Sequence, residues 1–406
     1  MAETDNSDDP GDLLAGVRVL DLSRVLAGPW CTQTLADLGA DVLKIEKPSG
    51  GDETRAWTPP EMGGVSAYFA CANRNKRSLA VDLTHPEGAA LVRELAQEAD
   101  VLVENFRAGS LTRFGLDSES LMEVNPGLVY CSVSGYGHTG SQARRPGYDF
   151  VIQAESGLMS ITGTADGPPV KVGVAISDLT ASFYAGQAVL AALLARQRTG
   201  RGRFIDVALF DCQVAALANV TSNYLATETS PSRYGNAHAN VVPYEVFEAS
   251  DGPFVLAVGN DAQFRRLCRD ILGDVDLAKS PDYATNSARV RNREALGRHL
   301  AEVFSHKPRA DWLEQFAQAD IPAGAINSVA EAIEGQQSVD HELIVSPEEG
   351  DAAFRMARHP VAYDGVRPAP RTAPPQLGEG GDAALADWLG LADEKIAGLR
   401  RNKAIR

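Results

Sequence analysis

The sequence predicts an α/β protein with a large, doubly wound, Rossmann-like parallel sheet and a smaller α+β domain. Two observations lead to this class. Short strand signals alternate with helices of about ten to fifteen residues through the first half of the chain, a pattern typical of parallel sheets with right-handed crossovers. After Phe210 the pattern changes to a hairpin, further helices and one last strand, which indicates a second domain.

In the first half, five short apolar runs are expected to be strands. They cover residues 17–22, 41–46, 77–83, 101–103 and 128–134. A turn at 27–29 should precede a helix over 30–38 that ends at Gly39. Residues 84–87 read as a capping box with Pro86 in the first turn, and the helix after it should bury Leu91, Leu95 and Ala99.

The stretch 167–200 carries the strongest local signal in the chain. Two prolines precede an extended run over 170–176, and Ser177-Asp178 opens a helix so rich in Ala and Leu that we expect it to be buried on all sides. Gly186 in its middle should mark the close approach of another backbone. Asp178 lies in the first turn, where the amide dipoles favour its ionised form. Taken alone, an Asp at this place is most often an N-cap, and the alternative is a carboxylate that points at a ligand.

The second half is predicted to hold the smaller domain, over 224–335. A helix over 211–224 and a polar connection over 226–240 lead into a hairpin at 244–248 and 254–258. Helices at 263–272, 289–304 and 310–319 and a strand at 322–326 come next. A passage rich in Pro and Gly over 360–381 then leads to a helical C-terminus.

Composition favours a cytoplasmic enzyme over a nucleic-acid or membrane protein. The 406 residues carry a formal net charge of −16, and no basic run exceeds two or three residues. Residues 1–12 read as a disordered acidic tail and not as a signal peptide. The cysteines lie too far apart for a close-spaced zinc motif or a disulfide scaffold, which suits a reducing compartment. They are Cys31, Cys71, Cys131, Cys212 and Cys268.

Ligands of such sheets bind beyond the carboxyl ends of the strands. Here those ends are residues 23–28, 46–47, 105–107 and 135–137. Residues 135–140 match G-x-G-x-x-G, but the segment after this motif contains Pro146 and Gly147 and cannot be the helix that a dinucleotide fingerprint needs. We therefore favour a glycine-rich substrate loop over a nicotinamide or flavin site.

The order of the motifs resembles the class III coenzyme A transferases, the CaiB/BaiF type that includes formyl-CoA and carnitine CoA-transferases. The resemblance runs from Gly16 almost to the C-terminus and rests on many stretches in one order. They include V-L-D-L-S-R-V-L-A-G-P, L-A-D-L-G-A-D-V-L-K-I-E-K-P, N-K-R-S-L-A-V-D-L, A-D-V-L-V-E-N-F-R-A-G, L-V-Y-C-S-V-S-G-Y-G and Y-G-N-A-H-A-N-V-V-P-Y.

This resemblance implies transfer of CoA from an acyl-CoA donor to a carboxylic acid, with Asp178 as the nucleophile. By analogy the pair is succinyl-CoA and a small dicarboxylate. The resemblance implies no metal and no tightly bound cofactor, since coenzyme A and acyl-CoA are substrates. Gly259 and Asn260 would stabilise the oxyanion that forms when a carbonyl is attacked. The role of His238 stays open. The residues expected to bind CoA are Leu26, Ala27, Lys47, Asn105, Phe106, Arg107, Arg113, Tyr148 and Asp149. Of these, Arg107 and Arg113 would contact phosphate, and the alternative for each is a surface ion pair.

The resemblance also implies a homodimer of two interlocked rings, with a large CoA-binding domain built from 13–223 and a returning segment, 336–406. Two other functions are weighed: an α-methylacyl-CoA racemase of the same superfamily, and a binding protein with an inactive site. Racemases carry Gly-His-Asp where this chain has Gly147-Tyr148-Asp149, and tyrosine is a poor base compared with histidine. The departure at Tyr148 favours the transferase.

Overall fold

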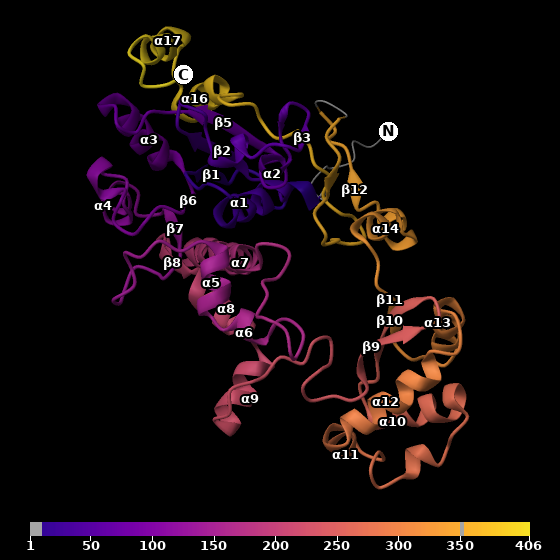
Figure 1. Cartoon of the computed structure of the whole chain (residues 1–406). Helices are drawn as coiled ribbons and strands as arrows, with labels where there is room; N and C mark the ends of the chain where they lie inside the picture. Colours follow the sequence, from indigo (N-terminus) through magenta and orange to yellow (C-terminus); the bar gives the residue numbers. More distant parts are fainter. Residues whose placement is uncertain (1–9, 350–352) are drawn as a thin grey trace. The chain divides into compact units, whose positions relative to one another are not determined.

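The computed structural model describes residues 10–349 and 353–406. Its contacts divide the chain into two compact units. The first comprises Met1–Leu158, Val172–Ala226 and Gln336–Arg406, and the second comprises Met159–Lys171 and Thr227–Gly335 (Figure 1). Met159–Lys171, which the sequence placed in the large domain, therefore belongs to the second unit. Most of the predicted tail, 1–12, lies outside the described residues, but Pro10–Asp12 forms a 3-10 helix with Pro10 and Gly11 buried, so disorder to residue 12 was wrong.

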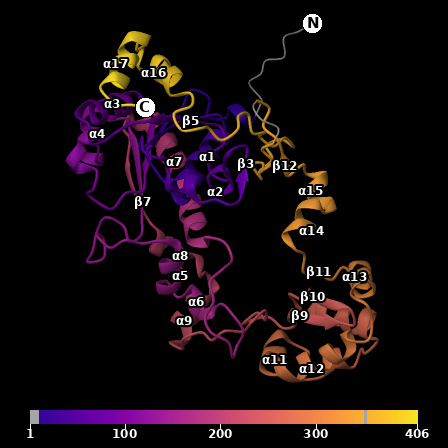
Figure 2. The same cartoon turned by 45° about the horizontal axis from the view of Figure 1, so that its top comes forward.

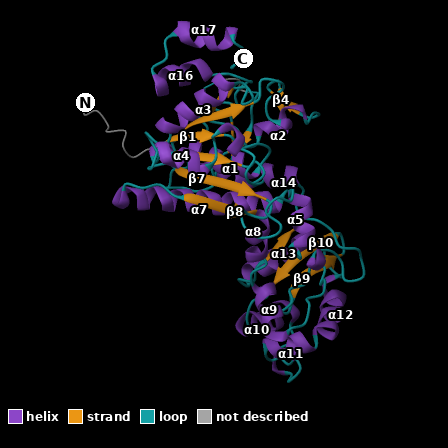
Figure 3. Ribbon diagram, turned by 90° about the vertical axis from the view of Figure 1, so that its left-hand side faces the viewer, coloured by secondary structure: helices purple, strands orange, loops and turns teal. Residues whose placement is uncertain are grey.

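A six-stranded parallel sheet forms the centre of the first unit (Figure 3). Its strands are β1 (Arg18–Asp21), β2 (Asp41–Glu46), β5 (Lys76–Ala80), β6 (Val101–Glu104), β7 (Val129–Ser134) and β8 (Phe204–Ala208). They lie in the order β5-β2-β1-β6-β7-β8. Successive strands are therefore added toward one edge of the sheet from β1 to β5 and toward the other edge from β6 to β8, and this reversal falls between the parallel neighbours β1 and β6. This is the strand order of Rossmann folds, and the reversal is where such sheets bind ligands. β8 is a sixth strand that the sequence reading missed.

Helices cover both faces of this sheet, as alternating side chains on each strand require. One core packs Leu20, Leu43 and Leu102 against α3 (Pro86–Glu98), α4 (Ser118–Val124), α16 (Gly381–Leu389) and α17 (Asp393–Arg401). Figure 2 shows these C-terminal helices beside α3. The opposite core packs Val19 and Val103 against α1 (Ala27–Asp37), α5 (Asp149–Glu155), α7 (Ile176–Thr199) and α8 (Leu209–Ala216).

The remaining elements of this unit are short. They are β3 (Glu61–Met62), β4 (Val65–Ser66), α2 (Ala67–Ala70), α15 (Gln336–Asp340), β12 (Ile344–Val345) and β13 (Met356–Ala357), with α6 (Leu158–Ile161) and α9 (Asn219–Thr227) at the boundaries of the units.

Several helix starts differ from the prediction. The expected turn at 27–29 is instead the first turn of α1, which tolerates Pro29 because amides there have no intrahelical partner. The expected capping box is absent from the described helix α3, whose N-cap is His85, with Nδ1 accepting from the Glu87 amide. The predicted helix over 211–224 is two helices, α8 and α9, which separate at Ala218, a residue with φ of 48°.

α7 is not buried on all sides in this chain. Its buried stripe includes Ala181, Ala185 and Val189, whereas Phe183 is 55% and Leu194 59% exposed. If Gly186 carried a Cβ atom, that atom would have no neighbour within 4 Å among the described residues. The expected close approach of another backbone at Gly186 is therefore also wrong within one chain. By length and hydropathy α7 could cross a membrane, but its buried stripe packs on α1 and the sheet like a core helix.

The second unit contains a three-stranded antiparallel sheet in the order β11-β10-β9. The predicted hairpin is confirmed as β9 (Tyr244–Ala249) and β10 (Gly252–Ala257), and β11 (Ala323–Ala325) is the last strand. The helices are α10 (Asp261–Arg266), continued by a π-helix at Leu267–Leu272, α11 (Asn286–Arg291), α12 (Arg293–Phe304), α13 (Arg309–Gln318) and α14 (Val329–Glu334). An aromatic core of Phe254, Phe304 and Phe316 holds helices and sheet together.

Candidate functional site

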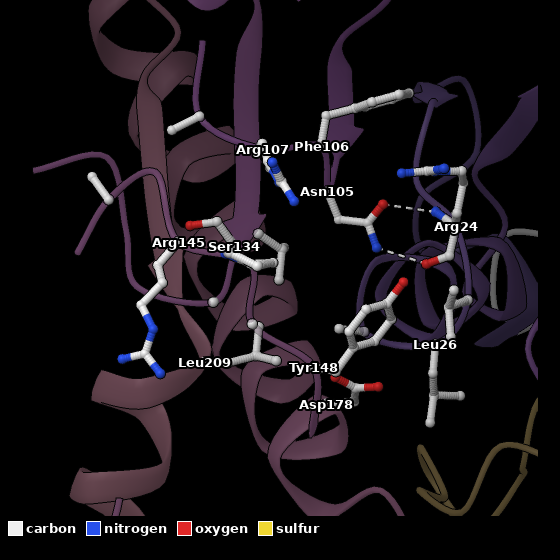
Figure 4. A pocket seen from close by; sticks show the side chains of 18 of the residues that line it. Arg24, Leu26, Asn105, Phe106, Arg107, Ser134, Arg145, Tyr148, Asp178 and Leu209 are labelled. Carbon is white, nitrogen blue, oxygen red and sulfur yellow. Dashed lines mark hydrogen bonds between the residues drawn. The ribbon is translucent and has the colours of Figure 1, made fainter. Parts of the chain in front are cut away.

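A cavity of about 300 Å³ opens at the carboxyl ends of β1, β6 and β7. Its lining residues come mainly from the segments 24–27, 105–108, 133–135 and 145–148, together with Asp178 (Figure 4). Three of the four strand ends singled out in the sequence therefore meet around one space. Because β1 and β6 flank the reversal of the sheet, this is the place where the fold predicts a ligand.

Asp178 reaches the cavity from the first turn of α7. The N-cap of the helix is Ala175, and Asp178 is its third residue, so the reading of Asp178 as an ordinary N-cap was wrong. Its carboxylate lies beside Tyr148 in Figure 4, and both line the cavity.

The amide that an N-cap would satisfy is bound by Asp149 instead. Asp149 Oδ1 accepts from the Ser177 amide at 2.8 Å, and Oδ2 accepts from Gln153 Nε2 at 2.7 Å. These two bonds turn the Asp149 side chain toward the helix end. Asp149 is thus a neighbour of the predicted nucleophile and is absent from the residues that line the cavity, where a CoA contact had been expected.

Burial, and then the negative charge of Asp149, raise the pKa of Asp178 to about 7. The helix dipole favours the anion, but removal from water outweighs it. A carboxylate that is partly protonated near neutral pH, in a cavity, is a functional-site candidate by its chemistry.

Some of the predicted CoA-binding residues near β1 and β6 line the cavity, and others position the loops around it. Leu26, Ala27 and Arg107 line the cavity directly, and Tyr148 is 67% exposed on its wall. Asn105 also lines it, but its amide forms a two-way clasp with the main chain of Arg24: Arg24 N donates to Oδ1 at 2.8 Å, and Nδ2 donates to Arg24 O at 2.6 Å. Asn105 therefore positions the loop after β1.

A second cavity of about 210 Å³ shares two lining residues, Arg24 and Phe106, with the first. The guanidinium of Arg24 lies 4.7 Å from the centre of the Phe106 ring. Lys47, a predicted CoA-binding residue, and Arg113, the other predicted phosphate ligand, line the second cavity. The expected site therefore extends over two adjacent cavities in the first unit, with cations in each.

A buried ion pair supports the loop after β1. Lys44 Nζ donates to Ser23 O at 2.7 Å and lies 3.1 Å from Asp52, and both side chains are fully buried. Asp52 in turn accepts from the amide of Val25 at 3.1 Å. Val25 has a φ of 68°, a strained value for a β-branched residue, and such strain persists only where the surroundings impose it.

Gly259 and Asn260 belong to the second unit, at the end of β10. The Gly259 amide donates to Gln263 Oε1 at 2.7 Å, and Asn260 caps α10 by accepting from the Gln263 amide. The Gly259 amide is therefore occupied within its own unit. His238 lies in the same unit, where its Nδ1 accepts from the Asn240 amide at 3.0 Å.

Sequence reasoning missed several residues around the cavity. Arg24 and Arg145 line it but were not singled out, and Leu209 comes directly after the strand that was overlooked. Tyr68 comes from the short helix α2, which no periodic signal announces. Burial, followed by the charge of Asp178, raises the pKa of Tyr68 to about 12.

A parallel Rossmann-like sheet with a carboxylate of raised pKa in a cavity at its ligand-binding edge is the arrangement of a candidate enzyme active site. The model of CoA-transferase family III matches residues 14–380. The chain belongs to this family, and it is a CoA-transferase.

Relatives and solved structures agree with this family. The chain is 45% identical over 388 residues to a succinate–glutarate CoA-transferase of Agrobacterium fabrum, covering 92% of this chain and 95% of the relative. It is 40% identical to the human succinyl-CoA:glutarate CoA-transferase, covering 95% and 88%. The crystal structure of a CaiB/BaiF family protein from Brucella suis superposes with a TM-score of 0.81 at 46% identity, over 92% of this chain and 99% of that one.

Proposed function

We propose that this enzyme transfers CoA from succinyl-CoA to glutarate or a similar small dicarboxylate, in the cytoplasm, through covalent intermediates on Asp178. The observation that carries the proposal is the position of Asp178: a carboxylate at the N-terminus of α7, in the cavity at the strand ends, with its pKa raised to about 7. The names of the relatives support the choice of the two acids.

In the first half-reaction, the ionised Asp178 attacks the thioester carbonyl of the donor. The C–S bond breaks, CoA leaves as a thiolate, and a mixed anhydride of Asp178 and the acyl group forms. The thiolate then attacks the aspartyl carbonyl, which releases the donor acid and leaves a CoA thioester on Asp178. Covalent catalysis of this kind divides one difficult transfer into steps of similar difficulty.

The second half-reaction repeats these steps in reverse order with the acceptor. Its carboxylate attacks the aspartyl thioester, and the released thiolate attacks the acyl carbonyl of the new anhydride. The product acyl-CoA leaves, and Asp178 is a free carboxylate again.

The tetrahedral intermediate of each of these four attacks carries an oxyanion that needs hydrogen-bond donors. Tyr148 lines the cavity beside Asp178, and its phenol is the candidate donor in this unit.

The cations around the two cavities would hold the rest of CoA. Arg107 lines the first cavity, and Lys47 and Arg113 line the second, in a protein whose net charge is otherwise −16. The phosphates of CoA need such local positive charge to overcome the long-range repulsion.

We also propose that the enzyme is a homodimer of interlocked chains. The apolar residues that α7 exposes, Phe183, Tyr184, Leu190 and Leu194, support an assembly in which a second copy covers this helix.

A matrix of acyl-CoA donors against carboxylic acid acceptors tests the proposal. Purified enzyme should convert succinyl-CoA and glutarate to glutaryl-CoA and succinate, and mono-carboxylates should be poorer acceptors. If no donor and acceptor pair exchanges CoA, the proposed function is wrong.

A further inference from the structure

Three polar residues lie side by side across neighbouring strands, on the sheet face away from α7. Glu104 on β6 is paired in register with Ser132 on β7, and Ser132 is paired with Asp206 on β8. Glu104 is 3% exposed and Ser132 is fully buried, in positions that continue the apolar rows of Leu102 and Tyr130. A buried carboxyl group is costly unless it has partners, and the steps proposed for CoA transfer do not use this one.

The hydrogen bonds of Glu104 and Ser132 lead to two loops: 105–108, which lines the first cavity, and 135–140, of which Gly135 lines it. Glu104 Oε2 accepts from the amide of Phe106 at 2.7 Å, at the start of the loop 105–108. Ser132 forms a hydrogen bond to the Glu104 carboxyl and lies 2.7 Å from Nε2 of His138, in the glycine-rich loop 135–140. The His138 amide donates to Asp206 at 2.8 Å, so the same loop is also fixed on β8.

We propose that Glu104, Ser132 and His138 form a positioning unit that holds the loops 105–108 and 135–140, and that the proton it carries controls how tightly CoA binds. The inference rests on the proposed function only in taking the cavity as the CoA site. The three residues are positioning residues, since Glu104 and Ser132 are covered and none of the three lines the cavity.

The hydrogen bonds can run in either direction through this unit without a movement of heavy atoms. With Glu104 ionised, His138 Nε2–H donates to Ser132 Oγ, and the Ser132 hydroxyl donates to the carboxylate. With Glu104 protonated, the carboxyl donates to Ser132 Oγ, and the hydroxyl donates to Nε2 of the His138 tautomer that carries its proton on Nδ1, so the unit has taken up one proton in total. Only the ionised form gives the Phe106 amide a charged acceptor, and such bonds are about twice as strong as neutral ones.

The groups around Glu104 place this change near neutral pH. The pKa of Glu104 is raised to about 7, with burial as the largest cause and the charge of Asp206 acting in the same direction. The hydrogen bonds from Ser132 and the Phe106 amide and the charge of Arg24 oppose this rise. The phenol of Tyr130 also lies near, but it is bonded to Leu116 O at 3.0 Å. Above pH 7 the loop 105–108 is held by a carboxylate, and below it by a neutral acid.

Binding of CoA to the intact enzyme, measured by calorimetry between pH 6 and pH 8, tests the inference. If only the form with ionised Glu104 binds well, its fraction falls from about 0.9 to about 0.1, and the Kd rises about tenfold toward pH 6. Glu104→Gln should bind weakly at both values and lose this tenfold change. Ionisation of CoA itself affects wild type and Glu104→Gln equally, so the ratio of their Kd values at each pH reports the ionisation of the protein alone.

His138→Gln is the second variant and keeps a side-chain amide near Ser132. It should fold, alter the pH response of the Kd and leave kcat at saturating substrate within about twofold, because it removes a titratable partner but no reacting group. Tyr130→Phe is the matched control: it removes a buried hydrogen bond on the same sheet face and should lower the Tm without changing the pH response.

If Glu104→Gln or His138→Gln keeps the wild-type pH response, the inference is wrong and the proposed function stands. If wild type does not bind CoA at any pH, the proposed function fails, and the inference fails with it. Should Glu104→Gln not fold, the His138→Gln result decides alone.

Discussion

The carboxylate of Asp149 accepts a hydrogen bond from the Ser177 amide at 2.8 Å, one residue before Asp178. Two acidic residues thus meet at one helix N-terminus with separate tasks. Asp149 satisfies the helix end, which leaves Asp178 free to face the cavity. The negative charge of Asp149 also raises the pKa of Asp178, so the residue that satisfies the helix end also adjusts the ionisation of the proposed nucleophile.

This arrangement predicts the pH dependence of transfer. Asp178 must be ionised to attack, and its pKa is raised to about 7, so kcat/KM should rise from pH 6 to pH 8. Asp149→Asn removes the neighbouring charge but keeps an oxygen that can accept from Ser177. We expect its profile to shift to lower pH. A profile for Asp149→Asn that coincides with wild type or lies at higher pH would contradict the assignment.

Loss of the nucleophile should abolish turnover without loss of CoA binding. Asp178→Ala and Asp178→Asn remove the attacking oxygen but leave Arg107, Lys47 and Arg113 in place. CoA exchange between acids should fall below about a thousandth of the wild-type rate, while calorimetry still detects CoA. Exchange above that level would show that Asp178 is not the nucleophile.

The sheet was predictable because its strands are short apolar runs between clear breakers. Asp41–Glu46 is bounded as expected, and the strand ends point to the correct edge of the sheet. β8 was missed because its sequence, Phe204–Ala208, contains Asp206, and its outer residues are exposed on the last strand of the sheet. An edge strand lacks the continuous apolar run by which central parallel strands are identified.

The site was predicted less completely than the fold, for a physical reason. The resemblance named Asp178, Tyr148 and Arg107, which do line one cavity. The supporting contacts join residues far apart in the chain, such as Asn105 with Arg24 and Lys44 with Asp52. Those contacts depend on how strands and loops pack, and no local pattern in the sequence specifies them.

The buried pair of Lys76 and Asp21 should be essential for stability. Lys76 Nζ lies 3.0 Å from Asp21 Oδ2, and both side chains are fully buried. Although burial opposes the charge, Lys76, Lys44 and two hydroxyls together hold the pKa of Asp21 at about 2. Lys76→Met would leave this carboxylate without its main partner, at a cost of about 3–5 kcal/mol in the free energy of unfolding by urea.

Lys279→Met provides the control for that measurement. Lys279 pairs with Asp276 at 2.9 Å, but the side chains are 71% and 87% exposed. Solvent screens such a pair, so its loss should change stability by less than about 1 kcal/mol. Equal effects of the two substitutions would contradict the role given to the buried pair.

The interlocked dimer predicts an assembly that does not dissociate on dilution. Separation of threaded chains requires unfolding, so sedimentation at nanomolar concentration should show only dimer. Phe183→Ser on the exposed face of α7 should lower the Tm of the dimer and not release a folded monomer. A folded monomer at any concentration would contradict the interlocked arrangement.

The last prediction separates the transferase from the racemase. Inversion of a stereocentre needs one group to remove a proton and another to return it from the opposite face. Asp178 supplies one such group, but the place of the histidine base of the racemases is held by Tyr148, a phenol that is 67% exposed on the cavity wall. Wild type should therefore exchange no α-proton of a 2-methylacyl-CoA with deuterated solvent. With succinyl-CoA it should form an adduct on Asp178 that hydroxylamine traps, and Asp178→Asn should form none. Rapid uptake of deuterium without such an adduct would favour the racemase, because it would assign Asp178 to proton transfer and leave no role for it as a nucleophile.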